Sequence, residues 1–210
     1  MVVLDGTAVP APQHYRAWAD DLAAHGFTAM RTGALSVRQA HQAELAGLVC
    51  VQELVLLEMG PPPRPASHLR RTRRLRTGQL DDIATVDRAA FGERWYLSAS
   101  MLDDVRTATP THRARVVTGL TTAPVDGFII AGRAARTGYV QRLAVHPDAQ
   151  RRGVGQALLG DAVSWMRRAR VHRVYVNTHV DNDAALALYR ENGFRELPER
   201  LRVYEGPTTT

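Results

Sequence analysis

The residues with the clearest chemical potential form a strand, a turn and a helix between Leu143 and Leu159. An apolar strand, Leu143-Ala144-Val145, is stopped by His146-Pro147, and a short basic turn leads directly into an amphipathic helix. Gly153 and Gly155 let the backbone approach a ligand closely. The first N–H groups of the helix have no partner within it and carry the positive end of its dipole. This pattern predicts an anion site, most naturally for phosphate.

Two arginines of the turn, Arg151 and Arg152, add charge suited to a diphosphate. The alternative for a bare glycine pair is a tight connection whose glycines only shape the chain. Two familiar nucleotide sites are excluded by the pattern. A dinucleotide fingerprint needs a third glycine where Leu158 stands, and a P-loop needs Gly-Lys-Ser/Thr, which is absent.

The turn resembles a family signature. Gln150-Arg151-Arg152-Gly153-Val154-Gly155 is similar to the (Gln/Arg)-x-x-Gly-x-(Gly/Ala) motif of the GCN5-related N-acetyltransferase (GNAT) superfamily. A second segment, Asn182 followed by Ala185-Leu186-Ala187-Leu188-Tyr189 and Gly193-Phe194, is similar to the pattern near the end of such domains. The resemblance covers roughly Leu75 to Glu205 and leaves the first 60 or so residues outside.

The resemblance implies an α/β fold with a mixed, largely antiparallel central sheet flanked by helices. It also implies acetyl-CoA as co-substrate and no metal. The apolar periodicity agrees with mixed α/β architecture. In this part of the chain it predicts strands near 74–77, 113–118, 125–131, 139–145, 173–178 and 194–204, and helices near 81–91, 97–106, 153–168 and 183–191.

Roles for individual residues follow from the same resemblance. Backbone amides of the turn would hold the pyrophosphate, and the strand end at 143–145 would splay from the strand at 173–178 to pair with pantetheine. The N–H of Leu143 or Val145 could polarise the thioester carbonyl. The implied cofactor-binding residues are Leu143, Ala144, Val145, Gln150, Arg151, Arg152, Gly153, Val154, Gly155, Gln156, Asn182 and Tyr189.

Tyr189 is the implied catalytic residue, because its hydroxyl would protonate the leaving thiolate as a general acid. The alternative is a tyrosine that packs its ring into the core beside Leu186. Asn182 would cap its helix, hydrogen-bond the pantetheine arm, or do both.

The general base is less defined. Phe91-Gly92-Glu93-Arg94-Trp95, together with the second motif, resembles the ribosomal-protein alanine N-acetyltransferase type, in which a glutamate often stands five residues before the asparagine. Asn177 occupies that position here and cannot take a proton. The alternatives are ordered water, Glu93, His179 or Asp181, or an α-amine that arrives partly neutral because its pKa is about 7.7–8.0.

The expected function is therefore acetyl transfer from acetyl-CoA to an amine, with the α-amine of a protein or peptide N-terminus favoured. A small-molecule amine acetyltransferase acting on an antibiotic, polyamine or amino acid is one alternative. A non-catalytic acetyl-CoA-binding module is another. Trp95 and Tyr96 would either line the acceptor cleft or belong to the core.

Composition sets broader limits. The 210 residues (23.2 kDa) are 45% hydrophobic and 23% charged, as in an ordinary globular protein with one dominant core. The net charge of +6 is local: six arginines lie between Pro61 and Leu80 without an acid, and the other 21 balance 21 acidic residues. This argues against a distributed nucleic-acid-binding face. The run Arg70–Arg76 would meet an acidic partner such as ribosomal RNA or form a solvated linker face.

A single cysteine, Cys50, excludes an intramolecular disulfide and a cysteine metal cluster, and it fits a reducing compartment. Neither a signal peptide nor a membrane span is expected, so a cytoplasmic location is predicted. The sequence leaves the oligomeric state open, a homodimer included.

Three parts are predicted along the chain: an appendage at 1–60, a Pro/Arg-rich linker at 61–73, and the acetyltransferase domain at 74–206. In the appendage, helices are expected at 12–24 and 36–46, with strands at 27–32 and 49–57. Moving residues 27–58 forward by 146 positions places Gly47 on Gly193. We therefore predict that the appendage is a degenerate half of a second GNAT-like unit, lacking the pyrophosphate turn, whose strands extend or cover the sheet.

Overall fold

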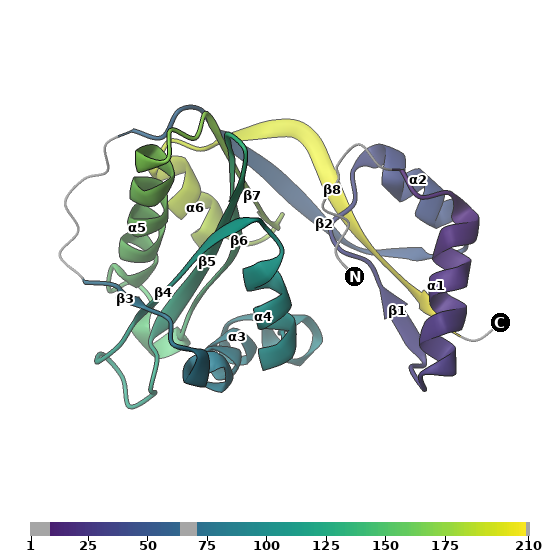
Figure 1. Cartoon of the computed structure of the whole chain (residues 1–210), viewed down its shortest axis with the longest axis horizontal. Coiled ribbons are helices and arrows are strands. Elements are labelled where there is room, and N and C mark those ends of the chain that lie inside the picture. The colour runs from purple at the N-terminus through teal and green to yellow at the C-terminus, as the bar shows by residue number, and fades with distance from the viewer. Residues whose placement is uncertain (1–8, 64–70, 209–210) are drawn as a thin grey trace. The chain divides into compact units, whose positions relative to one another are not determined.

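The computed structural model describes residues 9–63 and 71–208 (Figure 1). The chain forms two compact units, each assembled from segments that are distant in sequence. The first unit comprises Met1–Leu57, Asn177–Arg190 and Arg195–Thr210, and the second comprises Glu58–Val176 and Glu191–Phe194. Most of the predicted linker, with Arg64 and Arg70, lies outside the described residues.

The second unit is built on a sheet with the strand order β3-β4-β5-β6-β7. All neighbouring strands are antiparallel except β6 and β7, which are parallel. The strands are β3 (Arg73–Arg74), β4 (Thr111–Val117), β5 (Gly127–Ala134), β6 (Thr137–Val145) and β7 (Arg173–His179), whose last three residues belong to the first unit.

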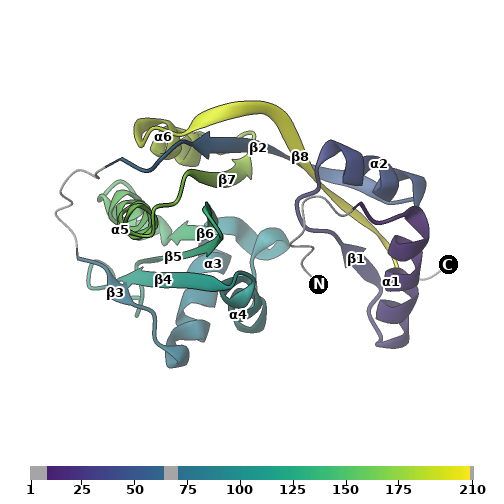
Figure 2. The same cartoon turned by 45° about the horizontal axis from the view of Figure 1, so that its top comes forward.

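Helices cover both faces of this sheet. Helix α5 (Val154–Arg168) packs on one face, and helices α3 (Leu80–Trp95) and α4 (Ala99–Thr107) pack on the other (Figure 2). Two short 3-10 turns, η1 (Thr77–Gln79) and η2 (Pro147–Ala149), precede α3 and α5. The core on the α3–α4 face contains fully buried side chains from both helices and from β5, including Ile83, Val86, Leu102, Phe128 and Ile130.

The described residues of the first unit form three strands and three helices, besides the end of β7. The strands are β1 (Ala29–Arg31), β2 (Val49–Met59, whose last two residues belong to the second unit) and β8 (Arg195–Pro207), and the helices are α1 (Pro12–Ala24), α2 (Val37–Leu45) and α6 (Asp183–Glu191). Strand β1 pairs with β8 antiparallel, from Ala29 opposite Pro207 to Arg31 opposite Glu205. Residues 195–207, predicted to lie in the acetyltransferase domain, thus share a compact unit with the N-terminal segment.

Tyr204 lies at the centre of the first unit's core. Its side chain on β8 is fully buried and packs with Tyr15 of α1, Met30 of β1 and Ala40 of α2. The hydroxyl donates a hydrogen bond to Glu44 Oε1 at 2.5 Å. Burial, reinforced by this carboxylate, raises the pKa of Tyr204 to about 12.

The mixed α/β class, with a largely antiparallel arrangement of strands, is confirmed, and most element boundaries lie within two or three residues of those expected. The helix predicted at 81–91 runs to Trp95, but Gly92 breaks it with a φ of 73°, close to the expected end. The strand predicted at 74–77 is shorter and earlier than expected. Thr77 begins the turn η1, so the chain has already left the sheet there.

The predicted internal repeat agrees with the element boundaries. Helices α2 and α6 begin 146 positions apart and both have nine residues. Strands β2 and β8 also begin 146 positions apart. The glycines that end the two helices, Gly47 and Gly193, have φ values of 93° and 87°. These agreements support the degenerate-half hypothesis, which stays a prediction.

A chain that begins at Arg71 is expected to lose cooperative unfolding, because it lacks the buried Tyr15, Met30, Leu35 and Leu48 that pack around Tyr204. Burying one large apolar side chain contributes about 1.5–3 kcal/mol, and a typical domain has only about 5–15 kcal/mol in total. Denaturant unfolding measures the loss.

The full-length variant Phe27→Ser is the control, because Phe27 is 57% exposed and its replacement should change stability by no more than about 0.5 kcal/mol. Full stability and activity of the shortened chain would overturn the degenerate-half hypothesis.

Candidate functional site

The predicted anion site is a turn with two left-handed residues, directly before α5. Arg151 has a φ of 55°, and Gly153, the N-cap of the helix, has a φ of 76°. No side chain caps this helix, so its first amides are left for another acceptor. Arg151, Arg152 and Gly153 are all exposed. The turn therefore presents backbone donors and two cations on the surface of the second unit.

A buried carboxylate holds the loop beside this turn. Asp126, fully buried before β5, accepts hydrogen bonds from Leu120 N at 2.8 Å, Thr121 N at 2.9 Å and Thr121 Oγ1 at 2.7 Å. Its carbonyl accepts from His146 N at 2.8 Å. Arg152 Nη1 donates to the Leu120 carbonyl at 3.3 Å. Sequence reasoning missed Asp126, although an acid in the otherwise apolar predicted strand 125–131 was a signal.

Strand β6 leaves part of one edge open. It pairs with β5 from Thr137 to Val145, but its parallel register with β7 covers only Thr137 to Tyr139, opposite Arg173 to Tyr175. The rings of Tyr139 and Tyr175 stack at the end of this register, with centroids 6.3 Å apart. In the sheet registers of the described residues, Leu143, Ala144 and Val145 pair only with β5, and the splay from the strand at 173–178 stays a prediction.

Gly127 lets the first turn of α5 sit close to β5 and β6. A Cβ at Gly127 would lie 2.8 Å from Cγ1 of Val154 and 3.0 Å from the carbonyl oxygen of Ala144. Val154, Ala144 and the following Leu158 are all buried. The absence of a side chain at Gly127 therefore permits the uncapped helix end to lie beside the open strand.

The two glutamines among the predicted site residues use their side chains within the protein. The Gln156 amide forms a reciprocal pair with the Asn192 amide, at 2.9 and 2.8 Å. The Gln150 side chain donates to the Val145 carbonyl at 3.4 Å. Gln156 thus has only its backbone N–H to offer an anion, which is the group assigned to it from the family pattern.

The second motif lies mainly in the first unit. Asn182 caps α6, since its Oδ1 accepts from Ala185 N at 3.1 Å, so one of its two predicted roles is realised. Tyr189 and Leu186 lie three positions apart on the buried face of α6, each 4% exposed. Tyr189 is therefore buried as it would be if its ring only packed in the core. Its role as a general acid stays a proposal.

The candidates for a general base are mostly solvent-facing. Asn177 is exposed, and the Glu93 side chain is 78% exposed with its carboxylate 3.4 Å from Arg88. His179 Nδ1 accepts from Asp181 N at 3.2 Å and lies 3.7 Å from the Asp181 carboxylate. None of these side chains stands out as a proton acceptor held in a buried setting.

A buried ion pair connects β6 to helix α3. The fully buried Asp87 accepts from Arg142 Nε and Nη2, both at 2.7 Å, and also from Leu97 N at 2.7 Å. Arg142 donates to the Trp95 carbonyl at 2.9 Å, and its guanidinium carbon lies 3.6 Å from the Phe91 ring centre. The pair thereby fixes the α3–α4 connection against the residue that precedes Leu143. Trp95 and Tyr96 are half-buried there, with an arginine over each ring.

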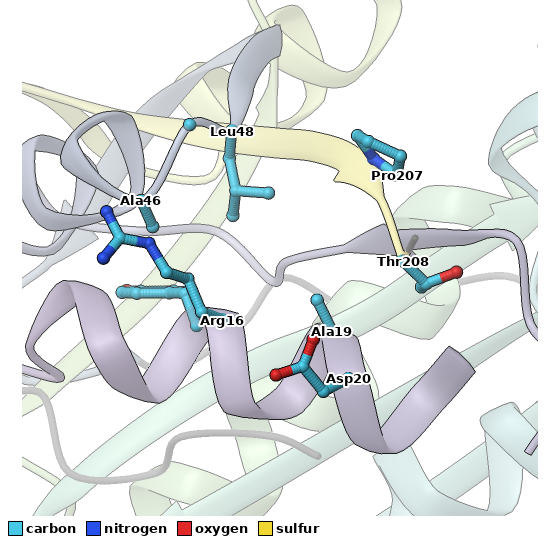
Figure 3. A pocket seen from close by; sticks show the side chains of 9 residues that line it. Arg16, Ala19, Asp20, Ala46, Leu48, Pro207 and Thr208 are labelled. Atoms are coloured by element: carbon cyan, nitrogen blue, oxygen red, sulfur yellow. The ribbon is translucent and has the colours of Figure 1, made fainter. Parts of the chain in front are cut away.

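A separate pocket of about 150 Å³ lies in the first unit (Figure 3). Arg16 and Asp20 project from α1 at its rim, and Leu48 lies across from them. Arg16 Nη2 donates to the Leu45 carbonyl at 3.0 Å. None of the predicted site residues lines this pocket, so it is not the candidate anion site.

No helix among the described residues is long and apolar enough to cross a membrane. In the same part of the chain, no three His, Cys, Asp or Glu side chains come together as a metal-binding group.

Comparisons with known proteins identify the segment that carries this turn. A model of the acetyltransferase (GNAT) family matches residues 106–194, which contain both predicted motifs. This segment belongs to the GNAT family. The family resemblance predicted from the motifs is thereby confirmed.

Two curated relatives match part of the chain. It is 43% identical over 65 residues to N-alpha-acetyltransferase RimI of Mycobacterium tuberculosis, covering 31% of this chain and 39% of that protein. It is 39% identical over 67 residues to the ribosomal protein bS18-alanine N-acetyltransferase of Escherichia coli K12, covering 32% and 44%. The chain thus spans about two fifths of the length of these relatives.

A solved structure shows a similar fold over nearly the whole chain. The GCN5-related N-acetyltransferase from Sphaerobacter thermophilus superimposes with a TM-score of 0.62 at 18% identity, covering 94% of this chain and 67% of that one. The fold similarity therefore extends well beyond the matched GNAT segment.

Gly127→Ala is expected to displace the first turn of α5, because the carbonyl of Ala144 cannot move without shifting β6. We expect a loss of about 1–3 kcal/mol in unfolding free energy. Acetyl-CoA affinity should fall about tenfold, which corresponds to about 1.4 kcal/mol. Gly78→Ala is the matched control, since no atom lies within 4 Å of its added Cβ. Equal behaviour of the two variants in denaturant unfolding and calorimetric titration would contradict the packing argument.

Asp87→Asn should cost about 3–5 kcal/mol of unfolding free energy, because it leaves the Arg142 guanidinium, whose side chain is 19% exposed, without its carboxylate. Asp103→Asn is the control: that aspartate is 40% exposed and pairs with Arg106, so its loss should cost about 1 kcal/mol or less. Urea unfolding compares them. A cost for Asp87→Asn no larger than that of the control would show that the buried pair does not stabilise the α3–α4 connection.

Proposed function

We propose that this protein is an acetyl-CoA-dependent N-acetyltransferase whose acceptor is the α-amine of a protein or peptide N-terminus. The observation that carries the proposal is the uncapped start of α5 behind the Arg151–Gly153 turn, beside the unpaired end of β6. An extended, phosphate-bearing co-substrate fits this arrangement. Its phosphate groups need backbone N–H donors, and its extended arm needs a strand edge with which to pair.

The turn would hold the pyrophosphate. Amides from Arg151 to Gln156 would donate to its oxygens, and the two arginines would neutralise their charge. The edge at Leu143-Ala144-Val145 would pair with the amide groups of the pantetheine arm as a neighbouring strand would. When bound, acetyl-CoA supplies an acetyl group activated as a thioester.

A backbone N–H group and the Tyr189 hydroxyl would each assist one part of the acetyl transfer. The N–H of Leu143 or Val145 would donate to the carbonyl oxygen, where negative charge develops as the amine nitrogen attacks. The new N–C bond forms, the C–S bond breaks, and the nitrogen releases its second proton to water to become the amide. Tyr189 would transfer its phenolic proton to the sulfur and recover a proton from solvent.

The proton of the acceptor ammonium is proposed to leave to water. Asn177 has no basic group, and the side chains of Glu93 and His179 are 78% and 39% exposed. An α-amine with a pKa of about 7.7–8.0 is partly neutral at physiological pH, whereas a lysine side chain with a pKa of about 10.4 is not. This difference favours N-terminal α-amines as acceptors.

The two curated relatives support a protein acceptor, since one is named as an N-alpha-acetyltransferase and the other as a ribosomal protein bS18-alanine N-acetyltransferase. A small-molecule amine is the second candidate, and a binding module without turnover is the third. The missing glutamate at Asn177 is the observation that favours the third.

Turnover should be measured as free coenzyme A thiol over peptides with Ala, Ser, Met and Gly N-termini, alongside small amines. We expect turnover with peptides only. Turnover confined to small amines would replace the protein-acceptor proposal. Absence of turnover with every acceptor, together with retained acetyl-CoA binding, would establish the non-catalytic binding module.

Tyr189→Phe should lower kcat by about 10²–10⁴-fold and leave acetyl-CoA affinity nearly unchanged, because only the proton donor is removed. Tyr15→Phe is the matched control, since Tyr15 is a buried helical tyrosine of the same unit and its hydroxyl makes only a long, 3.4 Å bond to the Gln39 carbonyl. Unchanged kcat in Tyr189→Phe would assign this ring to the core alone.

A further inference from the structure

Strands β3 and β4 lie side by side at the edge of the second unit's sheet (Figure 1). A second basic surface lies at this edge. It is a groove of about 310 Å³, and we name it the arginine groove. None of its lining residues belongs to the Leu143–Gln156 segment. Its charged and titratable lining residues are Arg74, Arg76, Arg106, His112, Arg113 and Arg115.

The strand register brings like charges face to face. Arg74 of β3 lies directly opposite Arg115 of β4. Because side chains alternate along a strand and Leu75 N still bonds the Ala114 carbonyl, Arg76 falls on the same face as Arg113. Like charges directly opposite on neighbouring strands destabilise a sheet. An anion bound between them would remove this repulsion.

Carboxylates of the protein neutralise only part of this charge. Asp161 on α5 accepts from Arg113 Nε at 2.5 Å and lies 3.4 Å from Arg115 Nε. Burial would raise the pKa of Asp161, but its hydrogen bonds to Arg113 and Thr72 outweigh burial, and the pKa lies below its usual value. The Asp161 carboxylate is therefore ionised near neutral pH, and both of its oxygens are already engaged by Arg113, Arg115 and Thr72.

The remaining cations have little compensation. Arg106 is paired with Asp103 at 2.5 Å, and its Nη1 lies 3.2 Å from His112 Nε2. Arg74 and Arg76 are exposed, and neither guanidinium forms an ion pair with a described residue. Of the five arginines that line the groove, Arg113 and Arg115 pair with Asp161 on the α5 side of β4, and Arg106 pairs with Asp103 on the α4 side. Subtracting these two carboxylates leaves an excess of three positive charges at this edge of the sheet.

The size and lining of the groove define the chemistry of its ligand. Planar guanidinium groups bind phosphate and carboxylate oxygens in pairs. Carboxylates on one side of an extended peptide are about 6.6 Å apart, so few would enter a groove of this volume. The groove's described lining contains no Phe, Tyr or Trp on which a nucleic-acid base could stack. Closely spaced phosphate groups match an excess of three charges best.

We propose that the arginine groove binds a compact anion with two or more linked phosphate groups. This site is separate from the proposed pyrophosphate turn and does not depend on acetyl transfer. Arg74 and Arg76 would contribute the uncompensated charge, and Arg113 and Arg115 would be held in position by Asp161.

The test is calorimetric titration of the full-length protein with inorganic tripolyphosphate at fixed ionic strength, in the presence of saturating coenzyme A. In the proposed function coenzyme A occupies the pyrophosphate turn, so binding of one tripolyphosphate per chain under these conditions would support the groove. Arg74→Gln/Arg76→Gln should weaken it about tenfold or more, because two charge-assisted contacts are lost.

Arg167→Gln/Arg168→Gln is the matched control, since it removes two exposed arginines from the last turn of α5 in the same unit. Circular dichroism checks that both double variants fold. Equal weakening in both, or no change in Arg74→Gln/Arg76→Gln, would overturn the proposal. So would tripolyphosphate binding that coenzyme A abolishes. Binding of an oligoribonucleotide or a glutamate-rich peptide at lower concentration than tripolyphosphate would replace it with a macromolecular ligand.

Discussion

The candidate site depends on the unequal pairing of strand β6 along its two edges. β5 pairs with β6 from Thr137 to Val145, with one register shift that leaves out Gln141, whereas the register with β7 runs only from Thr137 to Tyr139. A strand paired along one edge is held in place, and its other edge has N–H and C=O groups with which a ligand could pair, apart from the Val145 carbonyl, which accepts from Gln150. The start of α5 must then lie close to this opening. Gly127 permits that approach, because any side chain at that position would meet Val154 and the Ala144 carbonyl.

Buried carboxylates stabilise the segments on either side of this strand. Asp87 binds Arg142, one residue before Leu143, and Leu97 N in the α3–α4 connection. Asp126 fixes the β4–β5 loop through Leu120 and Thr121, and the Leu120 carbonyl accepts from Arg152. Both carboxylates are fully buried, so each is costly unless its hydrogen bonds are complete. They account for two acidic residues that sequence patterns assigned to no function.

The arginines of the second unit lie in three different environments. Arg142 is paired with the buried Asp87, Arg151 and Arg152 are exposed in the turn, and Arg74 and Arg76 lie at the sheet edge without an ion pair among the described residues. Three environments therefore give one residue type three roles: support of a strand, neutralisation of a pyrophosphate in the proposed function, and an excess of charge that predicts a second anion site. The local net charge noted in the sequence is in part the arginine groove, since Arg74 and Arg76 belong to the run between Pro61 and Leu80.

The sequence by itself determined the elements and the turn, because these depend on neighbouring residues. Apolar periodicity placed α1, α2, α5 and α6 within a residue or two, and the basic, glycine-containing turn was expected directly before α5. Only the tertiary structure decided which distant residues meet. Asp87 and Arg142 are 55 positions apart, and Glu44 and Tyr204 are 160 apart, so no local pattern could pair them. The same holds for the join of β8 with the N-terminal segment and for the strand register that sets Arg74 against Arg115, because both follow from how buried side chains fit across the sheet.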